Sequence, residues 1–400
     1  MRLMKVLKGW KMLLKKFSSL VILGFGVAVM ANDSILSNDR TTIFELNEKK
    51  AIEDSAKISK DWINPITYTY SNMDYKDSDK KDSTSVIAIS QPIFKSGGIY
   101  RAIKYASSLR NASLGDVEIA KKAAIKEATT TLFEIHKVIA QIKKQELLVK
   151  NSELDVLRKK EQVMGGILDA SYLDNALLDL SSKKLSLADL EYNKVALINK
   201  FDTLSDVSYS ELELPSLELL SEEEFMEKNK VIQKQEYTAN KDYHYSGMIL
   251  AKYLPTVNVV YNYTKYHGDH TTATSSSESQ KYGFSVVVPL DVRVLNETQS
   301  ARIEYIKSKI QTNIVKAEEE SLYKTKIASI NRVKQKLDIA KEELESYSSL
   351  VRQMEELSIA GLKTDLDLQT MQNSKSIKEQ DVNIFNYELQ MELLELYARI

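Results

Sequence analysis

Apolar residues recur at helical spacing along four long stretches of this chain, residues 116–164, 167–214, 290–360 and 362–400. These stretches contain neither Gly nor Pro and are rich in Lys, Glu, Leu, Ala, Ile and Ser, which predicts helices. Two series recur every seven residues in the third stretch: Ile330, Leu337, Leu344 and Val351, and Val333, Ala340, Tyr347 and Met354. The first stretch has a similar series at Ala128, Ile135, Ile142, Val149 and Val156. Such series predict coiled-coil seams, and at ~1.5 Å per residue the longest stretch would form an arm of roughly 100 Å.

Four shorter segments alternate apolar and polar residues, which predicts β-strands at about 65–72, 84–93, 255–265 and 281–290. Each has about the ten residues that a tilted strand needs to cross a bilayer. Val257, Val259, Tyr261 and Tyr263 of the third segment alternate with more polar residues such as Asn258, Asn262 and Thr264. This pattern is typical of a strand between lipid and water, with a half-buried soluble sheet as the alternative. The charged segment 72–82 and the polar segment 265–280 favour the membrane interpretation, because outer-membrane strands are joined by such loops.

Breaks in the helical pattern occur at equivalent places in the two halves of the chain. Gly165-Gly166 and Gly361 interrupt the long stretches, and Ser171-x-x-Asp174 and Thr364-x-x-Asp367 follow as predicted helix N-caps. Four of the five prolines also correspond, because Pro65 and Pro255 open the first strand of each pair and Pro92 and Pro289 close the second. The pattern therefore predicts a tandem duplication in which each unit joins two strands to a helical hairpin.

This organisation divides the chain into an N-terminal signal peptide at 1–31, a first repeat at 32–214 and a second repeat at 215–400. Helical hairpins are expected at about 97–205 and 293–400, and a helix at about 221–252 opens the second repeat. Pro215 lies in a linker between the repeats.

The first 31 residues have the composition of a secretory signal. Met1–Lys16 contains six basic residues and no acidic residue. A 14-residue apolar run, Phe17–Met30, follows and ends before Ala31. An uncleaved inner-membrane anchor is the alternative. Removal of this segment would shift the formal net charge from −1 to about −7, which argues against a nucleic-acid partner. The absence of cysteine excludes disulfides and thiolate metal sites.

The combined pattern resembles the TolC-like outer-membrane efflux proteins over about residues 42–400. The motifs that carry the resemblance are Gln91-Pro92-Ile93-Phe94-Lys95-Ser96-Gly97-Gly98, its weaker repeat Val288-Pro289-Leu290-Asp291, and the tip Gly361-x-x-Thr364-x-x-Asp367. The resemblance implies a mainly α-helical fold with a transmembrane β-barrel part. It also implies a homotrimer that forms a 12-stranded barrel in outer-membrane lipid and an α-helical tunnel across the periplasm of a Gram-negative bacterium. Four strands alone would leave two unpaired edges in lipid, which likewise favours assembly.

The resemblance also implies roles for residues at the two tips. Asp367 matches the acidic ring that narrows the periplasmic end of these channels, although it could simply cap its helix. Thr370 occupies the place where the family often has a second acidic residue, which weakens the expected electrostatic constriction. Residues at both tips match the surface that docks a periplasmic adaptor and, through it, an inner-membrane transporter; any single glycine could instead serve only the turn. The docking residues are Gly165, Gly166, Ser171, Asp174, Gly361 and Thr364.

The remaining patterns favour transport over catalysis. The sequence contains no phosphate-binding loop, nucleophile elbow or zinc-protease motif, so neither an enzyme activity nor a cofactor is expected. His267-Gly268-Asp269-His270 could form at best a weak metal site, so no metal is expected, and His136 and His244 are interpreted as structural. The channel could serve small-molecule efflux or one-step protein secretion. A periplasmic coiled-coil adaptor or an adhesin is the alternative from another class.

Overall fold

The computed structural model describes residues 35–74, 81–267 and 277–400, which belong to one compact unit. The predicted signal peptide at 1–31 and most of the two loops that join the paired strands lie outside these residues. In the described part of the chain, no helix combines the length and the apolar character needed to cross a lipid bilayer.

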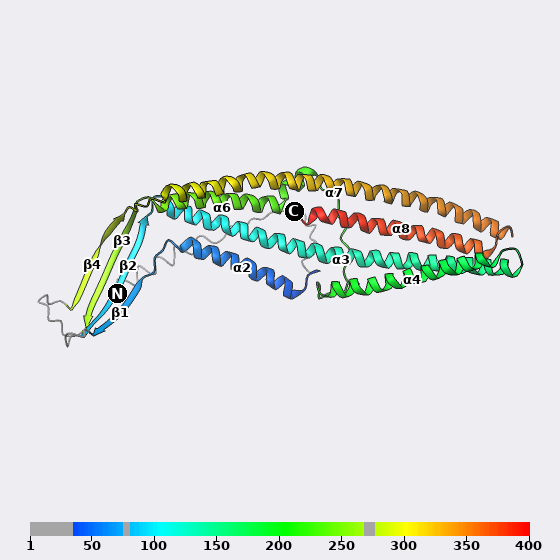
Figure 1. Cartoon of the computed structure of the whole chain (residues 1–400), viewed down its shortest axis with the longest axis horizontal. Coiled ribbons are helices and arrows are strands. Elements are labelled where there is room, and N and C mark those ends of the chain that lie inside the picture. The colour runs from blue at the N-terminus through cyan, green and yellow to red at the C-terminus, as the bar shows by residue number, and fades with distance from the viewer. Residues whose placement is uncertain (1–34, 75–80, 268–276) are drawn as a thin grey trace. The chain divides into compact units, whose positions relative to one another are not determined.

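The first half of the unit contains α2 (Asn38–Lys60), β1 (Thr67–Asp74), β2 (Lys81–Phe94), α3 (Gly98–Met164) and α4 (Ala170–Asp202). The second half repeats this order with α5 (Glu222–Lys228), α6 (Lys230–Lys252), β3 (Thr256–His267), β4 (Glu278–Val287), α7 (Val294–Ile359) and α8 (Asp365–Tyr397). The predicted mainly helical fold with long hairpins and four strands is therefore confirmed (Figure 1).

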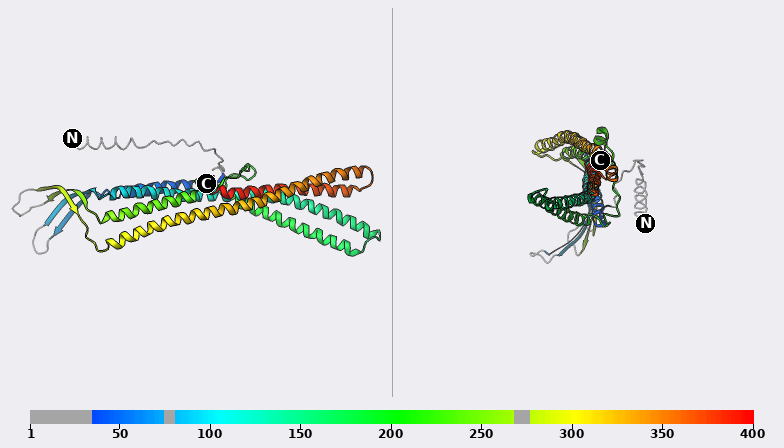
Figure 2. Two further views of the ribbon diagram at one scale, coloured as in Figure 1. Left: turned by 90° about the horizontal axis from the view of Figure 1, so that it is seen from above. Right: turned by 90° about the vertical axis from the view of Figure 1, so that its right-hand side faces the viewer.

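The strands form one antiparallel sheet in the order β1-β2-β3-β4, which lies at one end of the helices in both long views (Figures 1 and 2). β2 pairs with β3 from Ser83 opposite His267 to Phe94 opposite Val257, so the central contact joins the two halves of the chain. Pro92 does not close β2 as predicted, because the strand continues to Phe94 through an irregularity at Pro92. A proline is tolerated there because a bulge interrupts the hydrogen-bond ladder.

The helices pack as neighbours around the two longest ones. Near the sheet, α3 lies between α2 and α6, and α6 packs against α7; toward the tips, α3 lies between α4 and α8, and α8 packs against α7. The predicted seam of α7 is buried at Ile330, Val333, Leu337, Ala340 and Val351. The hairpin α7/α8 is therefore closed by the apolar heptad contacts expected from the sequence.

The predicted continuous helix at 221–252 is wrong, because Asn229 separates α5 from α6. Asn229 is fully buried; its Oδ1 accepts from the backbone N–H groups of Val231 and Ile232, and its Nδ2 donates to Glu319 at 2.9 Å. Arg399 in turn pairs with Glu319 at 3.0 Å. The side chain of Asn229 thus caps α6 and satisfies a buried carboxylate, which stabilises the break.

Candidate functional site

The first hairpin tip is a glycine turn followed by an aspartate cap. Gly165 follows α3, and Gly166 has a left-handed φ of 72°, a conformation that glycine adopts without steric cost. The predicted cap Ser171 is wrong: Asp169 is the N-cap of α4, and its Oδ1 accepts from the Ser171 backbone N–H at 2.9 Å. This hydrogen bond lowers the pKa of Asp169. Asp174 is exposed within the first turns of α4.

The second tip has the cap that the sequence predicts. Gly361 has a φ of 73°, and Thr364 and Asp367 form a capping box in which each side chain bonds the backbone N–H of the other residue. The hydroxyl of Thr364 also donates to Asp367 Oδ2 at 2.9 Å. The predicted role of Thr364 as the N-cap of this helix is therefore confirmed, and Asp367 has at least a structural function.

Asp367 also contacts the other hairpin, which the sequence did not reveal. Arg158 of α3 donates from Nη2 to Asp367 Oδ1 at 2.9 Å, across 209 positions of sequence. The pKa of Asp367 is lowered, first by the side-chain hydrogen bond from Thr364, with a further contribution from the charge of Arg158. Thr370 donates its hydroxyl to the Leu366 carbonyl at 2.7 Å, so this hydroxyl is used within α8. The candidate constriction therefore comprises an ion pair rather than an isolated carboxylate.

Arg158–Asp367 is the last of a series of polar contacts between α3 and α8. Lys137 pairs with Glu388 at 2.7 Å, Lys144 with Asp381 at 2.5 Å, and Asn151 with Ser374 at 3.4 Å. Both helices advance by seven residues at each step, in opposite directions. In the three ion pairs of this antiparallel ladder the cation lies on α3 and the anion on α8, and the neutral step Asn151–Ser374 keeps the same register, which places Arg158 beside Asp367. Basic residues at three of four successive heptad positions of α3, Lys137, Lys144 and Arg158, were a signal that could have identified Arg158.

The tips also expose large apolar side chains that the sequence reasoning missed. Met164 and Ile167 are 79% and 75% exposed at the first tip, and Ile359 and Leu362 are 89% and 70% exposed at the second. These four residues, here called the tip aliphatics, adjoin the glycines predicted for docking. Such a group is typical of a surface that another protein covers.

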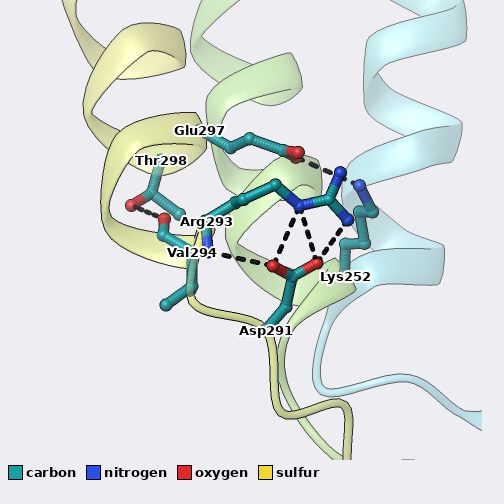
Figure 3. Close-up of polar contacts among 6 residues, drawn as sticks. All are labelled: Lys252, Asp291, Arg293, Val294, Glu297 and Thr298. Carbon is teal, nitrogen blue, oxygen red and sulfur yellow. Dashed lines mark hydrogen bonds and ion pairs between the residues drawn. The ribbon is translucent and has the colours of Figure 1, made fainter.

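A second charged cluster lies where the sheet meets the helices (Figure 3). Arg293 donates to both carboxylate oxygens of Asp291, at distances down to 2.6 Å, and Lys252 at the end of α6 pairs with Glu297 of α7 at 3.0 Å. The Arg293 side chain lowers the pKa of Asp291 to about 2. The Lys252–Glu297 pair joins the end of α6 to the start of α7, the Asp291–Arg293 pair lies within the segment that leads into α7, and every charge in Figure 3 has a partner of opposite sign.

The histidines do not assemble a metal centre in the described residues. His267 ends β3 with Nε2 at 2.8 Å from Ser85 Oγ, whereas Gly268, Asp269 and His270 lie outside the described ranges. His136 packs between Tyr209 and Tyr387, and burial lowers its pKa. His244 lies beside Arg101 and also has a lowered pKa, first through burial and then through that charge. Within residues 35–74, 81–267 and 277–400, no group of His, Asp and Glu residues could hold a metal ion.

No family model and no curated protein matches this chain. Solved structures do match: VceC, an outer-membrane protein of Vibrio cholerae, has 13% identity and a TM-score of 0.73, with 92% of this chain and 93% of that chain covered. The Campylobacter jejuni CmeC outer membrane channel has 13% identity and a TM-score of 0.71, with coverage of 92% and 84%. CusC, described in terms of transmembrane channel formation, has 13% identity and a TM-score of 0.71, with coverage of 96% and 95%. The chain therefore has the fold of TolC-like outer-membrane channels over nearly its whole length.

Proposed function

We propose that this chain is an outer-membrane channel that exports small molecules from the periplasm or from an inner-membrane pump. The observation that carries the proposal is the four-stranded sheet, which has one apolar face and one polar face and whose two edge strands are each paired on one side only within the described residues. Similarity to the CmeC channel and to VceC over most of both chains supports the same conclusion.

The strand register separates the two faces of the sheet. Directly paired residues share a face, so Tyr68 with Ile87, Ile89 with Tyr261, and Val259 with Phe284 belong together. The opposite face carries Thr67, Ala88, Asn262 and Lys281 in the same pairing. Tyr68, Tyr282 and Phe284 are 66%, 86% and 77% exposed, which is unfavourable in water and favourable in lipid.

The sheet edges require further copies of the chain. β1 and β4 each have a strand neighbour on one side only within the described residues, and unpaired backbone groups in lipid cost several kcal/mol each. Two copies would supply eight strands, and side chains fill the interior of a barrel of that size. Three copies would supply twelve strands, which leave an aqueous lumen. A homotrimer in outer-membrane lipid follows from this proposal.

The helices would continue the passage and narrow it at their tips. A threefold ring of Asp367 would favour cations, and its pairing with Arg158 would set how much negative charge faces the passage. The α7/α8 hairpin has an apolar seam, whereas its tip-proximal contacts with α3 are the polar ladder. The hairpins could therefore separate near the tips with little exposure of apolar surface, which would widen the constriction.

The tips are the proposed docking surface for a periplasmic adaptor that links the channel to an inner-membrane transporter. The tip aliphatics provide an exposed apolar surface, and the predicted docking residues Gly165, Gly166, Ser171, Asp174, Gly361 and Thr364 lie within or beside the same two turns. Loss of docking after mutation of Ile167 and Leu362, with trimer yield unchanged, would test this part separately.

The function is tested with protein purified from outer-membrane fractions. Trimers that dissociate on heating and give stepwise conductance in a planar lipid bilayer are the expected result. Recovery of a water-soluble periplasmic monomer with no conductance would reject the channel. Deletion of the gene, followed by measurement of the sensitivity of the cells to dyes, bile salts and antibiotics, would define the exported compounds.

A further inference from the structure

The polar face of the sheet carries a lysine in the middle of a row of uncharged residues. The strand register places Lys281 of β4 on this face, in the row that also contains Thr67, Ala88 and Asn262. The other residues of this face whose side chains the structure describes are uncharged, and many of them are Thr, Ser or Asn. Lys281 is therefore the one charge that this part of the polar face presents.

The neighbours of Lys281 on the polar face include no carboxylate. Asn262 lies directly opposite it on β3, and Ser279 and Gly283 lie two positions before and after it on β4. Lys281 is exposed, and within the described ranges no hydrogen bond or ion pair joins it to another residue. Its ammonium group therefore presents an uncompensated charge, and the amide of Asn262 and the hydroxyl of Ser279 are further donors to an anion at this place.

A lysine on the opposite, apolar face of the sheet is treated differently. Lys265 of β3 lies directly opposite Glu278 of β4, and its Nζ is 3.9 Å from the Glu278 carboxylate. A charge beside lipid is costly unless an opposite charge compensates it, whereas a charge beside water needs no partner. The compensated lysine on the apolar face and the uncompensated lysine on the polar face therefore agree with lipid on one side and water on the other.

We propose that Lys281 from three copies of the chain forms a cationic ring inside the barrel, and that this ring selects exported compounds with anionic groups such as carboxylate or phosphate. This inference rests on the proposed function, because the ring exists only where three copies close a barrel with the polar face inward. The aspartate at the other end of the passage does not oppose it. Asp367 is paired with Arg158 at 2.9 Å, so its charge is compensated, whereas that of Lys281 is not.

The dimensions of such a barrel let three lysines act on the whole lumen. Twelve strands spaced ~4.8 Å apart and tilted by about 40° enclose a barrel with a radius of about 12 Å at the backbone. A lysine side chain reaches about 6 Å inward on its four-carbon stem, so the three ammonium groups lie about 10 Å from one another. The Debye length is ~10 Å at 0.1 M salt and ~3 Å at 1 M, so their fields overlap only in dilute salt. Coulomb attraction in water should then enrich anions at the axis by roughly fivefold.

The ring is tested by the ion selectivity of single channels in a planar bilayer. With a KCl gradient near ~0.1 M, Lys281→Gln is expected to lower the ratio of chloride to potassium permeability at least about twofold, and Lys281→Glu further. The difference should disappear near ~1 M KCl. Lys265→Gln is the matched control, because it removes the same charge from the apolar face, and it is expected to leave the ratio unchanged. Equal ratios for the unchanged chain and Lys281→Gln in dilute salt would overturn the proposal.

Binding of a polyvalent anion gives a readout that does not require conductance. Calorimetric titration of purified trimers with tripolyphosphate is expected to show one site per trimer, and Lys281→Gln is expected to weaken this binding at least about tenfold, since three cations act on one ligand. Equal affinities in the two proteins, or no binding to either, would overturn the ring. Trimers that bind tripolyphosphate through Lys281 but give no conductance would reject the channel function alone. Conductance that is identical in all variants, without such binding, would reject this inference alone.

Discussion

At the residue scale, the pair Arg158–Asp367 is expected to determine the ion selectivity of the proposed constriction. Arg158→Gln leaves the Asp367 carboxylate without its nearby cation, so the reversal potential in a KCl gradient should shift toward cation selectivity. Asp367→Asn should shift it the other way, and the exchange R158D/D367R should favour anions. Lys137→Gln is the control, because it breaks a similar ion pair with Glu388 three heptads from Arg158. Identical potentials in all variants would leave Asp367 as a helix cap.

The lowered pKa of Asp367 makes a related prediction about pH. The Thr364 hydrogen bond and the Arg158 charge favour the carboxylate, so Asp367 stays ionised at pH values below the ordinary aspartate pKa of 3.8. A group with a depressed folded-state pKa stabilises the fold above its unfolded-state pKa, and this stabilisation is lost as pH falls through the folded-state pKa. Selectivity should therefore stay constant from about pH 8 to about pH 5 and decrease only under stronger acid. A midpoint near neutrality in a pH series of reversal potentials would contradict this assignment.

At the element scale, contacts within the α7/α8 hairpin should contribute more stability than the ladder between α3 and α8. Leu337 is buried in the apolar seam, so Leu337→Ala should destabilise the hairpin by about 2–5 kcal/mol. Lys144 and Asp381 are partly exposed, so Lys144→Gln should cost no more than about 1 kcal/mol. Chemical unfolding followed by circular dichroism would compare the two variants, and a larger loss of stability for Lys144→Gln would contradict the proposal that the hairpins separate at the polar ladder between α3 and α8.

The same elements show how far sequence patterns determine the fold. Long glycine-free and proline-free stretches with apolar heptads predicted the helices and the seam at Ile330 and Leu337, because these signals are local and periodic. The cap at Thr364 was predicted, but Asp169 competed with Ser171 and supplied the other cap, since both residue types favour that position. The break at Asn229 depends on Glu319 and Arg399, far away in sequence, and no local pattern reveals it.

The candidate site was less predictable than the fold. The position of Asp367 in a capping box follows from residues three apart, whereas its pairing with Arg158 depends on the register between α3 and α8. Exposure of the tip aliphatics cannot be predicted without knowledge of which helix faces are already packed. The sequence alone therefore predicted the capping residues of the second tip, whereas the contact of Asp367 with Arg158 became evident only from the structure.

At the scale of the whole molecule, the two faces of the sheet should be in contact with different media. Phe284 lies on the apolar face and Ser285, its neighbour, on the polar face. Phe284→Arg would place a charge in lipid, at a cost of about 2–4 kcal/mol near the bilayer midplane, and should reduce the yield of trimers in the outer membrane. Ser285→Arg adds the same charge on the side of the lumen, so trimer yield should be retained while the reversal potential shifts toward anions. The two variants differ by one position and add the same side chain, which makes each the control for the other. Equal loss of trimers would mean that both faces are buried in protein, and equal tolerance would mean that both are in water; either result would remove the sheet from the membrane.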